Sequence, residues 1–185
     1  VRWQEGREIY SQGPVRHLQL APLLPGHIYR YQIYNPGSGK VSAEHQLQAA
    51  ALPASGNLDV FLGSCAYLSS WPLEHKPIFE SLARHAQQNQ TEQLMLWLGD
   101  NLYYRPDDFA SANNMQARYQ KQRAFPGIAA LLPSMPNYAI WDDWDYGGND
   151  SDRHFVGRKD SRAVFRAMWP TPTGRMGDAS GQGMY

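Results

Sequence analysis

The amino-acid sequence predicts an α/β domain preceded by part of an immunoglobulin- or fibronectin-like β-sandwich, and three observations support this prediction. Up to about residue 50, short segments of alternating polar and apolar residues are separated by turns such as LLPG and NPGSG, which is typical of antiparallel sandwiches. Farther along, short continuous apolar runs alternate with helical patterns, as in parallel sheets with buried strands. Between these two parts, residues 51–56 read ALPASG, a composition typical of a linker.

Residues 1–50 are predicted to form an incomplete β-sandwich module. The stretch LLPGHIYRYQIY places Tyr29 and Tyr31 on one face of a strand just after a Pro-Gly turn. This pattern is typical of the tyrosine corner of immunoglobulin-like modules. About four strands are recognisable where a whole sandwich has about seven, so we expect strands that precede this segment.

Residues 57–185 are predicted to form the α/β domain. Its strands are expected at 58–65, 93–100 and 137–143, where the runs are continuously apolar. Residues 111–132 supply one or two helices, and a last helix is expected over 151–169, ended by Pro170. One further helix presents a single apolar face made of Ile78, Phe79, Leu82, Ala83 and Ala86.

Composition restricts the function. The chain has 185 residues, enough for a substantial core, with 17 basic and 17 acidic side chains, so no net charge favours nucleic acid or an anionic membrane. No apolar run approaches the roughly 20 residues of a transmembrane helix. The single cysteine excludes an internal disulfide bond, and nothing in the sequence indicates the oligomeric state.

Polar groups follow each of the three predicted strands. They are Ser64 and Cys65, then Asp100 and Tyr103, then Asp142 and Asp143. Because ligands bind outside the carboxyl ends of strands in such sheets, these groups are expected to converge. Crowded carboxylates repel one another unless a cation or protons intervene, and hard oxygen ligands suit Ca²⁺, Mg²⁺, Mn²⁺ or Fe³⁺. The sequence therefore predicts a metal site at this edge.

Each of these residues also has a simpler interpretation. Cys65 alone is more often an inert apolar side chain, and Asp100 alone is more often a cap of the next segment. The segment GGNDSD alone is a turn followed by a helix that Asp150 or Ser151 caps. Asp145 and Asp152 are expected to be solvated. Arg118 and Arg123 are most simply a charged helix face, with phosphate binding by Arg123 as the alternative.

The ordered set of motifs resembles a known family. Several segments are similar to successive motifs of PhoD-like alkaline phosphatases, within the calcineurin-like metallophosphatase superfamily. In chain order they are GSCAY, LMLWLGDNLYYRP, then RY and R, and finally LLPSMPNYAIWDDWDYGGNDSD. The preceding Tyr-rich β module is similar to the N-terminal module of those proteins. The resemblance implies the first part of a metallophosphatase-like α/β (α+β) sandwich. It also implies a hydrolase of phosphomonoesters or phosphodiesters that uses iron (Fe³⁺) and calcium (Ca²⁺) and is secreted, periplasmic or on the cell surface.

By motif position, the resemblance implies a role for each site residue. Cys65, Asp100 and Tyr103 match the iron-ligand positions. Asp100 would also bridge to a second metal site, to which Asp143 and Asn149 would contribute. Arg123 would meet the charge of the phosphoryl oxygens. The substrate would be a phosphate ester attacked by a metal-activated water.

Two departures from the family pattern leave other functions open. The family has a histidine where this chain has Trp144, and an indole has neither a lone pair for a metal nor a proton to exchange. Either a neighbour such as His154 substitutes or the chemistry is impaired, which would make the chain a non-catalytic secreted relative or binding protein. A weaker alternative is an adhesion module fused to a scaffold without metal. The family domain also continues beyond Tyr185, through further strands and a later metal motif.

Overall fold

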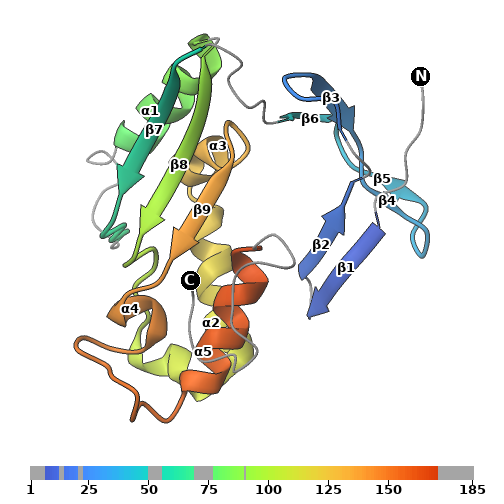
Figure 1. Cartoon of the computed structure of the whole chain (residues 1–185). Helices are drawn as coiled ribbons and strands as arrows, with labels where there is room; N and C mark the ends of the chain where they lie inside the picture. Colours follow the sequence, from blue (N-terminus) through green and yellow to red (C-terminus); the bar gives the residue numbers. More distant parts are fainter. Residues whose placement is uncertain are drawn as a thin grey trace.

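The computed structural model describes residues 7–12, 15–20, 23–49, 56–68, 77–89 and 91–170. Its N-terminal part contains only antiparallel pairs, in which β1 pairs with β2, β3 with β6 and β4 with β5 (Figure 1). The strands are β1 (Arg7–Gln12), β2 (Val15–Gln19), β3 (Ile28–Tyr31), β4 (Tyr34–Asn35), β5 (Lys40–Val41) and β6 (His45–Gln48).

The structure contains a hydrogen bond of the kind that a tyrosine corner makes, between the tyrosine hydroxyl and the backbone upstream. The hydroxyl of Tyr29 accepts a bond of 2.8 Å from the backbone N–H of Leu24, five residues upstream. On the same strand, the ring of Tyr31 stacks on His45 of β6 at 5.3 Å. The described strands of the N-terminal part form three separate two-stranded sheets, so an immunoglobulin-like sandwich stays a prediction.

The α/β part is built on a three-stranded parallel sheet of order β7-β8-β9, and its helices lie on one face of that sheet (Figure 1). The strands are β7 (Leu58–Gly63), β8 (Glu92–Leu98) and β9 (Asn137–Ile140). The helices are α1 (Pro77–Gln88), the short 3₁₀ helix η2 (Pro106–Ala110), α2 (Ala112–Arg123), α3 (Pro126–Leu131), α4 (Asp143–Tyr146) and α5 (Arg158–Met168).

The core lies between the sheet and these helices. Trp97 of β8 is 3 % exposed, and its ring packs against Phe79 of α1 at 6.1 Å and against Trp169 at 5.6 Å. Tyr119 of α2 and Phe165 of α5 are fully buried in the same cluster. Burying an aromatic side chain of this kind contributes about 2–3 kcal/mol, so these contacts attach the helices to the sheet.

Among the described residues, β7 and β9 are not buried on both faces, as the continuous apolar runs had predicted. Along β7 and β9, residues of intermediate exposure alternate with exposed ones, because among the described residues only one face of the sheet is covered by helices. The uncovered face is apolar and includes Leu58, Val60, Leu62, Leu98, Tyr138 and Ile140. A continuous apolar run indicates a strand but does not report what packs on its second face.

The last helix also differs from its prediction. α5 begins at Arg158, with Gly157 as its N-cap, rather than near residue 151. The residues before it form turns, with Asp150 at φ 57°, and Phe155 packs from this loop onto Phe109 at 5.3 Å. The short helix α4 was not predicted, although Asp142 caps it. Phe155 therefore makes its ring contacts with Phe109 and Tyr146 from a loop.

Gly99, which joins β8 to Asp100, is a position where only glycine fits. Its φ is 97°, and an added Cβ would lie 2.6 Å from Cβ of Asp142. We therefore expect Gly99→Ala to lower the free energy of unfolding by about 2 kcal/mol or more, through backbone strain and overpacking. Urea unfolding measures this change. Gly148→Ala is the control, because its nearest contact would be Ser151 Oγ at 4.0 Å, and an equal loss in both variants would contradict the expectation.

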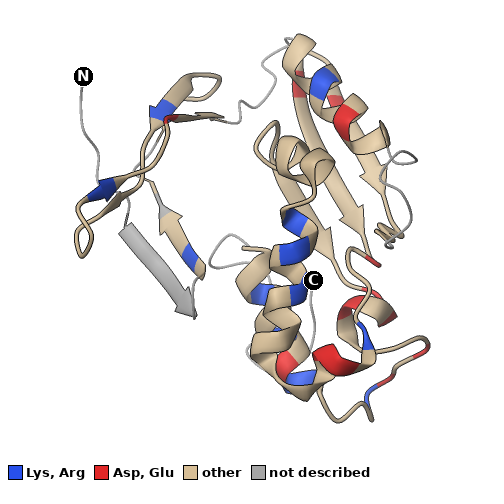
Figure 2. Cartoon of the chain, turned by 180° about the vertical axis from the view of Figure 1, so that it is seen from behind, with Lys and Arg blue, Asp and Glu red and all other residues tan. Residues whose placement is uncertain are grey.

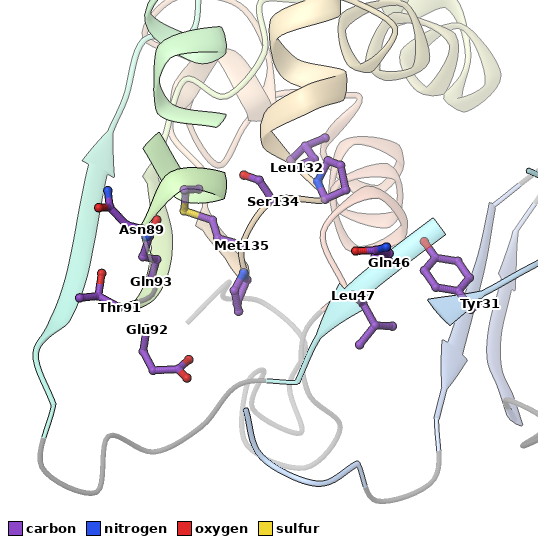
Figure 3. A pocket seen from close by; sticks show the side chains of 13 residues that line it. Tyr31, Gln46, Leu47, Asn89, Thr91, Glu92, Gln93, Leu132, Ser134 and Met135 are labelled. Atoms are coloured by element: carbon purple, nitrogen blue, oxygen red, sulfur yellow. The ribbon is translucent and has the colours of Figure 1, made fainter. Parts of the chain in front are cut away.

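A cavity of about 240 Å³ lies between the β3–β6 hairpin and the amino end of the parallel sheet, away from the strand ends that carry the predicted site (Figure 3). Gln93, at the start of β8, lines it and is buried, and neither atom of its amide has a hydrogen-bond partner within the described ranges. Figure 3 shows Tyr31, Gln46 and Leu47 on one side, with Leu132, Ser134 and Met135 facing them.

Candidate metal site

The loops after β7 and β8 are held together at the carboxyl edge of the sheet. The backbone N–H of Cys65 donates to Gly99 O at 3.3 Å, and that of Ala66 donates to Asp100 O at 2.9 Å. Cys65 and Asp100 both have positive φ, at 57° and 50°. Non-glycine residues seldom adopt this conformation, and such strain is concentrated at functional sites.

Three carboxylates meet at this edge, and we call Asp100, Asp142 and Asp143 the acidic cluster. Each offers one oxygen, and these oxygens all lie within 4.8 Å of one another. Two of these residues follow β9 and one follows β8, so the predicted convergence of strand ends is confirmed for them. Parallel strands cause this convergence, because their carboxyl ends lie at the same edge.

Asp100 lies at the centre of the polar contacts. It is 9 % exposed, and its Oδ2 accepts a bond of 2.7 Å from Tyr103 Oη and a weak one of 3.8 Å from Cys65 Sγ. Its Oδ1 is buried and has no hydrogen-bond partner among the described residues. A buried carboxylate oxygen without a partner is costly, and a cation would satisfy it.

The protonation of Tyr103 depends on its burial and on the neighbouring side chains of Asp100 and Cys65. Burial is the main cause that raises the pKa of Tyr103 well above its usual value, and hydrogen bonds to Asp100 and Cys65 raise it further. A cation would act in the opposite direction, since it stabilises a phenolate. The carboxylate and phenol oxygens fit a hard divalent or trivalent cation, and the thiol of Cys65 is the one soft donor of the set.

Asp145 was expected to be solvated, and this expectation is wrong. Its side chain is fully buried, and its Oδ2 accepts from Asn101 N at 3.1 Å, Asn101 Nδ2 at 3.2 Å and Asp142 N at 3.2 Å. Tyr119 Oη donates to its Oδ1 at 3.3 Å. Asp145 thus joins the loop after β8 to the loop after β9. The spacing of Asp142 and Asp145, which form a capping box, is a signal that sequence reasoning missed.

Burial also changes the ionisation of Asp145. It raises the pKa of this carboxyl to about 7, although hydrogen bonds from Asn101, Asp142 and Tyr119 act to lower the pKa. The nearby charge of Asp100 raises it slightly further. Asp145 therefore differs from Asp142 of the acidic cluster, which is exposed.

Trp144 lies at the site, and His154 does not join the cluster. The ring of Trp144 packs on that of Tyr103 at 5.1 Å. His154 is exposed on the loop before α5, where its backbone N–H donates to Asp152 Oδ1 at 2.9 Å. Among the described residues, the group able to hold a metal contains no histidine.

The structure places Asn149 near one cluster residue. Asn149 Nδ2 donates to Asp150 Oδ2 at 2.5 Å, and the backbone N–H of Asp150 donates to Asp143 Oδ2 at 2.6 Å. Asn149 is therefore connected to Asp143 through Asp150.

The predicted phosphate-binding arginine has other contacts. Arg123 donates to the backbone oxygen of Met168, and its guanidinium lies 4.9 Å above the ring of Trp169. Burial lowers its pKa. These contacts attach α2 to the end of α5.

Sequence reasoning missed another arginine. Arg105 NH2 donates to Tyr67 Oη at 3.3 Å, and the rings of Tyr67 and Tyr103 pack at 4.8 Å. Arg105 is exposed and is linked to the site through these two rings. Its position in the motif LGDNLYYRP, two residues after Tyr103, was the available signal.

The parallel sheet, the helices on one face and the acidic edge define a layered α/β protein with a candidate metal site. No protein-family model and no curated protein matches the chain. Its fold is similar to a solved structure described as the structure of PhoD, with a TM-score of 0.61 and 15% identity over 92% of this chain. The match covers 36% of the PhoD chain, so this chain spans about a third of that length.

The described helices are all too short or too polar to span a lipid bilayer.

Proposed function

We propose that this chain carries part of the active site of a metal-dependent hydrolase of phosphate esters, of the PhoD-like alkaline phosphatase and phosphodiesterase kind. The observation that supports this proposal best is the acidic cluster with buried Asp100, whose Oδ1 meets no hydrogen-bond donor among the residues that the structure describes. The similarity of fold to PhoD and the resemblance of the motifs agree with it. The proposal includes export from the cytoplasm and an immunoglobulin-like N-terminal module.

The proposed metal ligands form two sets that share Asp100. Cys65, Asp100 and Tyr103 would hold Fe³⁺, because anionic sulfur and oxygen donors favour a trivalent ion. Asp100, Asp143 and Asn149 would hold Ca²⁺, with Asp142 as a further carboxylate within reach. When bound, such ions lower the pKa of a coordinated water toward neutrality and so supply a hydroxide nucleophile.

The chain's own residues would position the substrate. Asp100 would keep the two metal sites at one spacing, and the contact from Tyr103 Oη fixes the orientation of its carboxylate. Arg105 is the exposed cation linked to Tyr103 through Tyr67, so it is a candidate partner for the phosphoryl oxygens, beside the proposed role of Arg123.

The alternative is a non-catalytic relative that retains the site, and the position of Trp144 favours it. Trp144 occupies the position where the family has a histidine, and its ring packs against that of Tyr103. An indole offers one N–H donor but no lone pair for a metal. Hydrolysis of p-nitrophenyl phosphate and bis(p-nitrophenyl) phosphate, with metal content determined on the same sample, separates the two functions. Absence of both bound metal and turnover would overturn both.

Replacing Trp144 with His tests the missing imidazole directly. We expect Trp144→His to raise turnover by roughly a hundredfold or more, because a positioned general acid contributes about 10²–10⁴ in rate. Tyr138→His is the matched control, since this exposed side chain on β9 lies on the uncovered face of the sheet. An equal change in both variants would contradict the expectation. Turnover in the unmodified protein would support the hydrolase.

A further inference from the structure

A second cavity is lined in part by the segment from β9 to α4, which also supplies residues of the candidate metal site. It is a cavity of about 480 Å³, and none of the residues that line it is an Asp or Glu. We call it the basic pocket, after Arg153, His154, Arg158, Lys159 and Arg162, which line it. Figure 2 shows basic residues on α5 and on the loop before it, with acidic residues among them. The chain has no net charge, so this concentration of positive charge is local.

Three of these cations lie close together at the start of α5. Arg158 and Lys159 occupy the first turn of α5, where positive charge opposes the helix dipole, whereas Asp160 in the same turn carries the favourable sign. Arg162 lies one turn after Arg158, and like charges four residues apart on a helix repel each other. No side chain caps this helix at Gly157. A bound anion would relieve these repulsions.

Two aromatic rings form the remaining lining of the pocket. Trp141 and Tyr146 pack edge to face at 5.1 Å, and Trp141 also contacts Phe165 of α5 at 5.7 Å. These contacts hold the indole in place beside the cations. Flat aromatic groups next to several cations suit a ligand that combines a planar organic group with phosphate groups.

We propose that the basic pocket binds a ligand with two or more linked phosphate groups, whose planar organic group contacts Trp141 and Tyr146, as in a nucleoside diphosphate. Arginine and lysine bind phosphate oxygens through charge-assisted hydrogen bonds, and several cations favour a polyanion over a monoanion. The binding does not rest on the proposed hydrolase function, because no residue of the pocket belongs to the acidic cluster.

Calorimetric titration of the metal-free chain, kept in EDTA, tests the proposal with ADP, AMP and pyrophosphate as probes. We expect ADP to bind more tightly than AMP or pyrophosphate. The double variant Arg158→Gln and Lys159→Gln is expected to weaken ADP binding at least about tenfold. Lys121→Gln is the matched control, because this exposed lysine of α2 lies outside the pocket, and it should leave ADP affinity within about twofold.

Other results would overturn the proposal. No ADP binding, equal affinity for ADP and AMP, or equal weakening by Lys121→Gln would exclude a site for linked phosphates in this pocket. Equal affinity for ADP and pyrophosphate would exclude the aromatic contact. The double variant should fold, since it removes cations from the start of a helix, and circular dichroism checks this. Asp100→Asn should retain ADP affinity, which separates this site from the candidate metal site.

Discussion

Replacing Asp100 with Asn is expected to abolish stoichiometric metal binding at the acidic cluster. Asp100 is the proposed bridging ligand, and its buried Oδ1 has no hydrogen-bond partner in the part of the chain that the structure describes. Loss of a residue that only supports a ligand typically costs 10- to 100-fold in metal affinity, so loss of the ligand itself should cost at least about 100-fold. Calcium titration and metal analysis of the purified protein measure this effect, and turnover should disappear with the metal.

Asparagine is the appropriate replacement, because Asp100 has φ 50° and asparagine tolerates this conformation. The metal-free variant should be at least as stable as the wild type, since one charge leaves a crowded cluster. Asp107→Asn, which changes an exposed carboxylate of η2, serves as the control and should bind metal normally. If Asp100→Asn retains both metal affinity and turnover, the proposed site is wrong.

Replacing Asp145 with Ala is expected to lower the free energy of unfolding by about 3–5 kcal/mol. The buried carboxylate accepts hydrogen bonds from Asn101, Asp142 and Tyr119, and alanine would leave these donors without a partner. It would also leave a cavity in a fully buried position. Urea unfolding of the metal-free protein measures the loss.

Asp145→Asn separates the hydrogen bonds from the charge. Its amide oxygen can accept from Asn101 and Asp142, while its NH₂ group can donate to the Tyr119 hydroxyl, so the loss should be clearly smaller than for alanine. Asp160→Ala, at an exposed position of α5, should stay within about 1 kcal/mol of the wild type. Equal losses in Asp145→Ala and Asp160→Ala would mean that the network does not stabilise the fold.

Local sequence patterns were sufficient for much of the α/β part. The apolar runs at β7, β8 and β9 and the polar residues that end them follow directly from residue order. The convergence of Asp100, Asp142 and Asp143 could therefore be predicted, because a parallel sheet brings its carboxyl ends to one edge. The start of α5 could not, because packing of Phe155 on Phe109 competes with its helical pattern.

The sequence by itself determined the three parallel strands and the acidic residues at their ends, because these depend on spacing within short segments. Only the tertiary structure decided that Asp145 is buried, that Arg123 packs on Trp169 and that Trp144 packs on Tyr103. Each of these placements depends on contacts between elements far apart in the chain. Local charge and hydropathy do not report such contacts, since the same carboxylate is stable in water or in a network of buried donors.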